Sequence, residues 1–247
     1  MSGKGLTPPL RIAICNSRNN GWHWLTPAMQ DRKRKDTCII YIHGYANKPS
    51  DAISAYYTLM HHTKDMGVDH IGFVWPSKGK ITRYFSDLRT TREVVDELMS
   101  LIAILKAEGY KKIGINAHSM GGHLTMEFMR YLKELKLRNN PIDMIALLGA
   151  DCIRWKFKEK NKYGIVSNLV KKLYNYYSPY DNILRFVSKL ARPLQRIGNH
   201  DMPRRSPSNY VDIDANHYSS KKVRHRDYKK LHRLQRNIVS KLLQIDG

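Results

Sequence analysis

The chain has 247 residues and a formal net charge of +22, with 43 lysines and arginines against 21 aspartates and glutamates. This length allows one domain with a large buried core. No apolar run approaches the ~18 to 20 residues of a membrane-spanning helix, and no basic stretch followed by a long apolar run marks a secretory signal. We therefore expect a cytoplasmic protein with a single domain over residues 10–247 and a mobile segment at 1–9.

The positive charge is concentrated late in the chain. Residues 151–247 hold 22 lysines and arginines against 8 aspartates and glutamates. A field of this sign attracts anionic partners, which include acidic lipid surfaces, nucleic acids and anionic substrates. The three cysteines, Cys15, Cys38 and Cys152, lie in or beside apolar runs without metal-ligand spacing. They are expected to be small core residues in a reducing compartment.

The first predicted elements form a hairpin. Residues 10–15 and 22–25 have strand character, and the Asn20-Gly21 pair between them favours the positive φ of a turn. An antiparallel hairpin at a sheet edge is therefore expected.

Residues 37–42, Thr-Cys-Ile-Ile-Tyr-Ile, are a continuous apolar run typical of a strand that is covered on both faces. The run leads into His43-Gly44-Tyr45, where glycine allows the backbone to turn so that the next amide faces a site at the strand end. Tyr45 is the candidate donor of one oxyanion-binding amide. The simpler interpretation is a tight turn without a chemical role.

Helices and strands then alternate. We expect helices at 50–66 and 83–108, separated by a strand at 71–74 that ends in Trp75-Pro76-Ser77. This alternation predicts an α/β fold with a mostly parallel sheet flanked by helices. In such sheets, sites lie at the carboxyl ends of the strands.

The next stretch, 112–122, reads Lys-Ile-Gly-Ile-Asn-Ala-His-Ser-Met-Gly-Gly and precedes a helical stripe at 123–135. Ser119 lies between small residues, Ala117 and Gly121, as a strained strand-to-helix turn requires when it presents a nucleophilic hydroxyl. The amide of Met120 would be the second oxyanion donor. The alternative is a serine that only caps the helix.

After a strand at 142–150, residues 161–172 are expected to form a loop or a short lid-like helix, followed by a strand at 173–177. Asp181 comes shortly after that strand, in the chain order serine, acid, histidine of hydrolases with such a turn. We assign it the role of orienting a histidine, with Asp151 as the second choice.

A strand at 210–213 and a basic helix at 227–245 complete the chain. The general base should come from the loop between them, because only a base within hydrogen-bond range can take the serine proton. His217 and His225 both qualify, and His200, which precedes the strand, is a weaker third. The residues alone do not choose among them.

Taken together, these segments resemble a bacterial family of α/β-hydrolase-fold serine hydrolases whose natural substrates are largely unassigned. The resemblance covers roughly 37–230 and rests on the motifs that contain His43-Gly44-Tyr45, Trp75-Pro76-Ser77, Ala117 to Gly121, and Tyr176-Tyr177-Ser178 with Asp181. It implies Ser119 as nucleophile, Asp181 as acid and a histidine in a His-x-x-Tyr or His-Ser-Tyr string beyond the last strand. His225-Arg226-Asp227-Tyr228 fits that string better than His217-Tyr218 does, although Arg226 and Asp227 depart from the small residue usual there.

The expected function is hydrolysis of a carboxylic ester or related acyl bond through Ser119, His225 and Asp181, as in an esterase or lipase, without metal or organic cofactor. The alternative is an inactive protein of the same fold that binds nucleic acid or an anionic membrane surface through its basic C-terminal third.

Overall fold

The computed structural model describes residues 10–16, 21–25, 34–136, 141–190 and 194–245, so the predicted mobile segment 1–9 lies outside the described residues. Eight strands form one sheet in the order β2-β1-β4-β3-β5-β6-β7-β8. Neighbouring strands are parallel except β1 and β2, which pair antiparallel at the edge. The strands are β1 (Leu10–Asn16), β2 (Gly21–Trp24), β3 (Thr37–Ile42), β4 (Asp69–Val74), β5 (Lys112–His118), β6 (Met144–Leu148), β7 (Lys172–Tyr177) and β8 (Tyr210–Asp214). The predicted mostly parallel sheet with an antiparallel N-terminal edge hairpin is confirmed.

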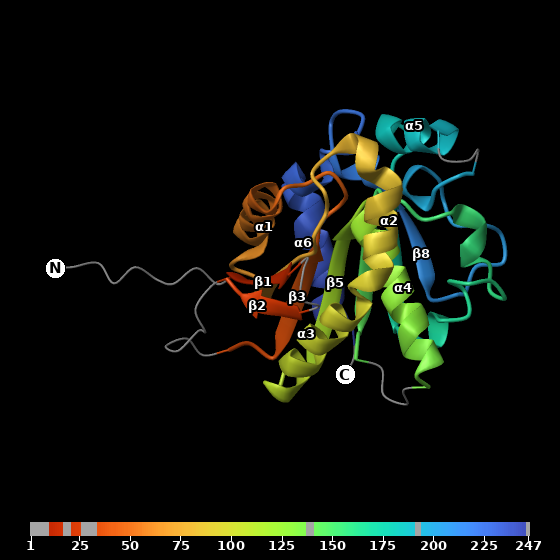
Figure 1. Ribbon diagram of the computed structural model, residues 1–247. Coiled ribbons are helices and arrows are strands. Elements are labelled where there is room, and N and C mark those ends of the chain that lie inside the picture. Colours follow the sequence, from red (N-terminus) through yellow and green to blue (C-terminus); the bar gives the residue numbers. More distant parts are fainter. Residues whose placement is uncertain (1–9, 17–20, 26–33, 137–140, 191–193, 246–247) are drawn as a thin grey trace.

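Helices cover both faces of this sheet (Figure 1). One hydrophobic cluster joins one face to side chains of α2, α3 and α4, and a second joins the other face to α1 and α6. Burial on both faces explains why central strands such as β3 are apolar throughout. The helices are α1 (Pro49–Thr63), α2 (Tyr84–Glu93), α3 (Val95–Ala107), α4 (Met120–Glu134), α5 (Asn182–Leu190) and α6 (His232–Gln244). Cys15, Cys38 and Cys152 are buried and free, which confirms them as core residues.

The helix expected at 83–108 is two helices. Val94 leaves the helical region, with φ −99° and ψ 17°, and separates α2 from α3. Both halves pack on α4: Thr91 of α2 is hydrogen-bonded to His123, and α3 buries an apolar stripe that includes Leu98 and Leu101. The helical periodicity of the sequence continues across the break and therefore did not predict it.

Residues 161–171 form the loop of the two alternatives expected there: they contain a 3₁₀ turn (Ser167–Leu169), and Tyr163 and Val166 are buried in the core, so the segment is a packed loop and not a lid. One further segment differs from expectation. The helix expected at 227–245 begins only at His232, after a separate 3₁₀ turn (Tyr228–Lys230).

The carboxyl ends of the seven parallel strands lie at one edge of the sheet. His43 follows β3, Ser119 follows β5 and Asp181 lies four residues after β7. The register places these ends side by side, since Ile42 pairs with Ala117 and Leu148 pairs with both His118 and Tyr176. This edge is where the predicted site residues gather.

Candidate active site

Ser119 occupies a strained turn between β5 and α4. Its φ of 55° and ψ of −121° are unusual for a residue other than glycine. The turn is held by its own backbone, because the Ser119 amide donates to the Leu148 carbonyl at 3.0 Å and its carbonyl accepts from the amides of Gly122 and Asp151, each at 3.0 Å. This arrangement matches the strand, sharp turn and helix expected around Ser119.

Two glycines make the turn sterically feasible. A Cβ on Gly121 would lie 2.6 Å from the carbonyl oxygens of both Ile42 and His43. A Cβ on Gly44 would lie 2.8 Å from the Cβ of Ser119. The β3 and β5 turns are therefore in direct backbone contact, and the sequence signal of small neighbours around Ser119 reflects that contact.

Replacing Gly121 with alanine should lower the free energy of unfolding by more than about 3 kcal/mol, because the new methyl group meets backbone and not a flexible side chain. Gly67→Ala is the comparison: Gly67 has φ +72° but nothing within 4 Å of its Cβ position, so only about 1 to 2 kcal/mol of backbone strain is expected. Urea unfolding of both variants measures the difference. An equal loss of unfolding free energy in the two variants would show that the Ile42 and His43 carbonyls can move away from the new methyl group.

The structure brings Ser119, His225 and Asp181 together from separate segments. Oγ of Ser119 lies 2.9 Å from Nε2 of His225, and Nδ1 of His225 lies 2.6 Å from Oδ2 of Asp181. All three residues are buried, with 2%, 5% and 0% exposed surface in that order. With the Nδ1 proton directed at the carboxylate, Nε2 is free to accept the serine proton. Asp181 is itself fixed, because its Oδ1 accepts the Leu184 amide at 3.0 Å.

The alternative residues lie elsewhere. His217 is exposed in a 3₁₀ turn after β8, and no hydrogen bond links it or His200 to Ser119 within the described ranges. Asp151 is engaged by other partners: its Oδ1 lies 2.8 Å from Nε of the buried Arg196, and its Oδ2 accepts from the Tyr84 hydroxyl at 2.7 Å. The geometry therefore pairs His225 with Asp181 and not with Asp151.

His118, which sequence reasoning did not single out, supports the His225 loop. Its Nε2 donates to the His225 carbonyl at 2.8 Å, and the two rings lie 4.7 Å apart between centroids. Burial, followed by the nearby His225, lowers the pKa of His118 to about 3. Since the carbonyl fixes the proton on Nε2, Nδ1 of this neutral ring is an acceptor. No local sequence signal predicts a contact between residues 107 positions apart.

The His43-Gly44-Tyr45 turn is clamped by Trp75. The two rings stack 5.1 Å apart, the Trp75 indole donates to the His43 carbonyl at 2.8 Å, and Nε2 of His43 lies 3.1 Å from the Trp75 carbonyl. Asn47 closes the other side, because its amide group donates to the carbonyls of Gly44 and Tyr45 at 2.9 and 3.1 Å. The Trp75-Pro76-Ser77 segment thus fixes a loop that lies directly against Ser119.

The main-chain amides of Tyr45 and Met120 remain open. Neither donates a hydrogen bond to any residue that the structure describes. Met120 is the first residue of α4, so its amide is one of the unsatisfied donors at a helix N-terminus, where partial positive charge accumulates. The two amides belong to the adjoining turns that Gly44 and Gly121 hold in contact.

A cleft of about 450 Å³ opens beside Ser119 and His225. Its lining includes both apolar and polar side chains. The apolar and aromatic ones include Tyr41, Ala55, Tyr56, Leu59, Leu148 and Ile183. Asn47, Asp51, Ser54, Arg226 and Lys229 also line the cleft. Such a shape suits a small substrate with an apolar part and a polar part.

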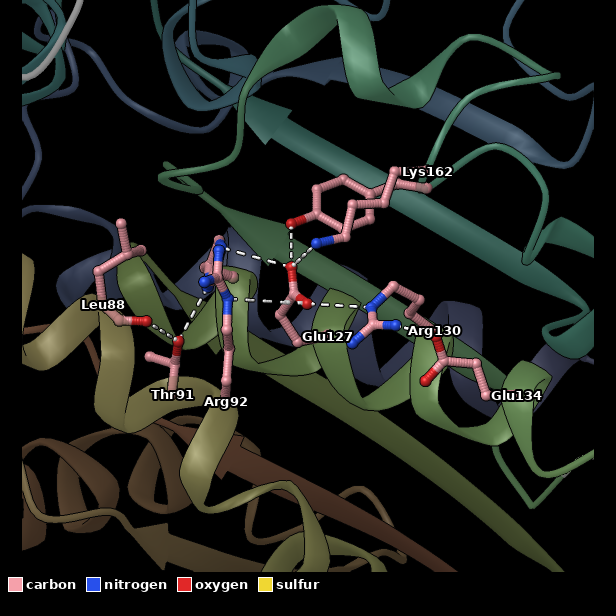
Figure 2. Close-up of polar contacts among 9 residues, drawn as sticks. Leu88, Thr91, Arg92, Glu127, Arg130, Glu134 and Lys162 are labelled. Atoms are coloured by element: carbon pink, nitrogen blue, oxygen red, sulfur yellow. Dashed lines mark hydrogen bonds and ion pairs between the residues drawn. The ribbon is translucent and has the colours of Figure 1, made fainter.

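A buried carboxylate secures the helix that follows Ser119. Glu127 of α4 accepts from the Tyr163 hydroxyl at 2.7 Å and pairs with Lys162 at 2.8 Å and Arg130 at 3.2 Å (Figure 2). Burial raises its pKa, but these hydrogen bonds and charges prevail and lower it to about 2. Glu127 therefore ties the 158–166 loop to α4, away from the cleft.

Acid should destabilise the protein through two buried histidines, His43 and His123, and the partly buried His118. Burial lowers the pKa of His43 to about 4 and those of His118 and His123 to about 3. An unfolded histidine has a pKa of ~6.5, so from about pH 6.5 down to 4 the unfolded chain binds more protons than the folded one. The free energy of unfolding should therefore fall between pH 7 and pH 5, by on the order of 2 kcal/mol or more. Glu127 stays ionised throughout this range.

Urea unfolding at pH 7, 6 and 5 measures this dependence. His123→Gln should reduce the slope, whereas the same change at the exposed His217 should leave it intact. A free energy of unfolding that is flat or rises toward pH 5 would contradict the assignment of neutral buried rings.

Within the described ranges, no group of three or more histidine, cysteine, aspartate and glutamate side chains is placed to hold a metal ion. None of the helices described there is long and apolar enough to cross a bilayer.

Comparison with known proteins gives three findings. Residues 18–241 match the family described as "Alpha/beta hydrolase of unknown function (DUF900)". The chain is 24% identical over 210 residues to an uncharacterized protein of Nostoc sp., alr1448, a match that covers 64% of this chain and 55% of that protein. This chain therefore spans about half the length of that relative.

The esterase domain of a Rhodothermus marinus protein shares the architecture: it superposes with a TM-score of 0.55 at 11% identity, covering 93% of this chain and 95% of that one. At this identity the likeness is one of fold alone. An alpha-beta serine hydrolase homologue from Coxiella burnetii gives a TM-score of 0.48 at 13% identity, covering 86% and 88%.

Proposed function

The chain belongs to the family of alpha/beta hydrolases of unknown function, and from that premise we propose that it is a serine hydrolase that cleaves a carboxylic ester or related acyl bond. The observation that carries the proposal is the continuous chain of contacts from Ser119 Oγ to His225 at 2.9 Å and from His225 to Asp181 at 2.6 Å. A hydroxyl, an imidazole and a buried carboxylate in this order form a nucleophile, a general base and a group that orients the base.

In the first half of the reaction, Ser119 Oγ attacks the substrate carbonyl carbon while His225 Nε2 takes the hydroxyl proton. The carbonyl oxygen becomes an oxyanion, for which the amides of Tyr45 and Met120 are the proposed donors. Asp181 accepts the Nδ1 proton of His225 in a hydrogen bond and stabilises the imidazolium. The tetrahedral intermediate then expels the alcohol, which leaves with the proton from His225, and an acyl-Ser119 ester remains.

In the second half, water replaces the alcohol. His225 removes a proton from the water as it attacks the acyl-serine carbonyl, and the same two amides receive the second oxyanion. Collapse of this intermediate returns the proton to Ser119 Oγ and releases the carboxylic acid. Each residue is thus restored, and no redox partner is consumed.

Pre-steady-state kinetics with 4-nitrophenyl esters of increasing chain length tests the proposal. An acyl-enzyme that hydrolyses more slowly than it forms releases a rapid burst of nitrophenolate equal to about one per chain before the steady rate. Hydrolysis without a burst shows that acylation is the slower step, and loss of that hydrolysis in Ser119→Ala then tests whether it passes through Ser119. A folded protein that neither hydrolyses nor becomes acylated contradicts the proposal.

The rival proposal is an inactive protein that binds nucleic acid or an anionic membrane through the basic C-terminal third. Its support is the charge of residues 151–247, 22 basic against 8 acidic side chains. Binding of this kind weakens steeply with salt and needs neither Ser119 nor His225. An oligonucleotide shift and vesicle co-sedimentation at low and high salt detect it. The buried contacts among Ser119, His225 and Asp181 favour the hydrolase.

A further inference from the structure

Two positive charges line the cleft beside the proposed general base. Arg226 follows His225 directly, and Lys229 lies three residues further, in the 3₁₀ turn before α6. Both side chains are exposed, and neither forms an ion pair with any residue in the described ranges. Arg226 and Lys229 differ from the other lysines and arginines that the structure describes because these two line the cleft and the others lie outside it.

Their charges act on groups at the site. Burial raises the pKa of the Tyr45 phenol, and the charge of Arg226 opposes that rise. Burial and then His225 lower the pKa of His118, and Lys229 adds to that effect. Arg226 and Lys229 therefore each lie within electrostatic range of a side chain that lines the cleft.

One carboxylate also lines the cleft, but it has another partner. Asp51 lies in the first turn of α1, and its Oδ2 accepts the Lys48 amide at 3.1 Å. At a helix N-terminus, an acidic side chain is offset by the partial positive charge of the free amides. Asp51 is thus engaged at the start of α1, and neither Arg226 nor Lys229 is paired with it.

The cleft also contains apolar and aromatic side chains. Tyr41, Tyr56, Leu59 and Leu148 line it and give a hydrocarbon part of a substrate a surface on which to pack. A ligand that satisfies both parts has an apolar stem and a negatively charged end.

We propose that the cleft selects esters that carry a negative charge, either a carboxylate or a phosphate, and that Arg226 and Lys229 bind this group. The inference rests on the proposed serine hydrolase function and names its substrate class. Arg226 adjoins His225 in the chain, so an anion bound there holds the ester close to the general base. Specificity for the charged substrate then comes from binding and not from a change in the chemistry at Ser119.

Mono-4-nitrophenyl glutarate and 4-nitrophenyl butyrate test the proposal, because the two esters share a leaving group and differ in the terminal carboxylate. The wild-type protein should have the higher kcat/KM on the glutarate, and 0.5 M NaCl should reduce that preference. Arg226→Gln and Lys229→Gln should each reduce the ratio of the two kcat/KM values by about fivefold, in the range of an exposed charge pair. Lys230→Gln, which removes an exposed charge outside the cleft, should leave the ratio unchanged.

Competition experiments show whether Arg226 and Lys229 bind a carboxylate or a phosphate more tightly. Succinate and inorganic phosphate, used as inhibitors of butyrate hydrolysis, show which anion the pair binds more tightly. A wild-type preference for the neutral ester, or a ratio that both glutamine variants leave intact, overturns the proposal.

Failure of the proposed function is distinguishable from failure of this inference. Hydrolysis of the butyrate without any preference for the glutarate leaves the hydrolase proposal standing and rejects the anionic substrate. If neither ester is hydrolysed, calorimetric titration of Ser119→Ala protein still decides: binding of the glutarate that Arg226→Gln weakens supports the anion site, and equal affinity for both esters rejects it.

Discussion

Replacement of Ser119 by alanine should lower kcat for a 4-nitrophenyl ester by about 10⁶-fold, the magnitude seen when a serine nucleophile is removed from another serine hydrolase. The reason is that the proposed mechanism has no covalent path without Oγ, so only binding and the oxyanion donors can still act on the substrate. The hydroxyl makes its one described hydrogen bond with His225. Stopped-flow and long-time assays of the purified variant measure the loss.

The fold should survive this change. Alanine fits where serine does, at the same backbone angles, so the thermal midpoint should move by only a few degrees. Ser208→Ala, at an exposed loop position, provides the matched control and should keep full activity. A Ser119→Ala protein that retains more than about one hundredth of the wild-type kcat would exclude Ser119 as the nucleophile.

Asp181→Asn should reduce kcat by about 10⁴-fold with little change in KM. An asparagine in this place can present its NH₂ group to Nδ1 of His225, which then loses its proton to Nε2 and can no longer accept one from Ser119. The asparagine oxygen can keep the bond from the Leu184 amide, so the local backbone should remain in place. Steady-state kinetics beside a urea unfolding curve separates the catalytic loss from any loss of stability.

Asp151→Asn is the matched comparison, and it should lower stability while leaving kcat nearly unchanged. It removes the charge that faces the buried Arg196 at 2.8 Å, and an uncompensated buried charge costs about 3 to 5 kcal/mol of stability. The folded fraction should nevertheless turn over within about tenfold of the wild-type rate. A large loss of kcat in Asp151→Asn, with Asp181→Asn still active, would transfer the role of the acid to Asp151.

The sheet could be predicted because its signals are local. A strand buried on both faces is apolar throughout, and the run at 37–42 coincides with β3 (Thr37–Ile42). The turn at Ser119 could be predicted for the same reason, since the small residues that permit it lie within two positions. What the sequence did not show was how tight the turn is, because the atoms that Gly121 approaches belong to β3 and the turn after it.

Features that depend on contacts distant in the sequence were harder to predict. Ser119 and His225 are 106 positions apart, so the residues alone left three histidines open, and only the family resemblance favoured one of them. No local sequence pattern predicts the contact of His118 with His225 or that of Trp75 with His43. The break at Val94 was missed for a different reason, because the helical periodicity of the sequence continues across it.

Helix α5, which follows Asp181, was also not assigned from the sequence. Its nine residues begin directly after the acid, and the Asp181 side chain accepts the amide of Leu184 in its first turn. The same carboxylate that orients His225 therefore also begins this helix. A helix-capping contact and the contact with His225 therefore coincide at Asp181.

The central claim is that Ser119 is a nucleophile activated by His225, and active-site labelling tests it most directly. The folded protein is incubated with a fluorophosphonate probe and digested, and the modified peptide is identified by mass spectrometry. We predict one adduct per chain, on Ser119, with labelling that Ser119→Ala abolishes and His225→Ala slows strongly. Folded protein that stays unlabelled, or that carries the adduct on another residue, would contradict the account.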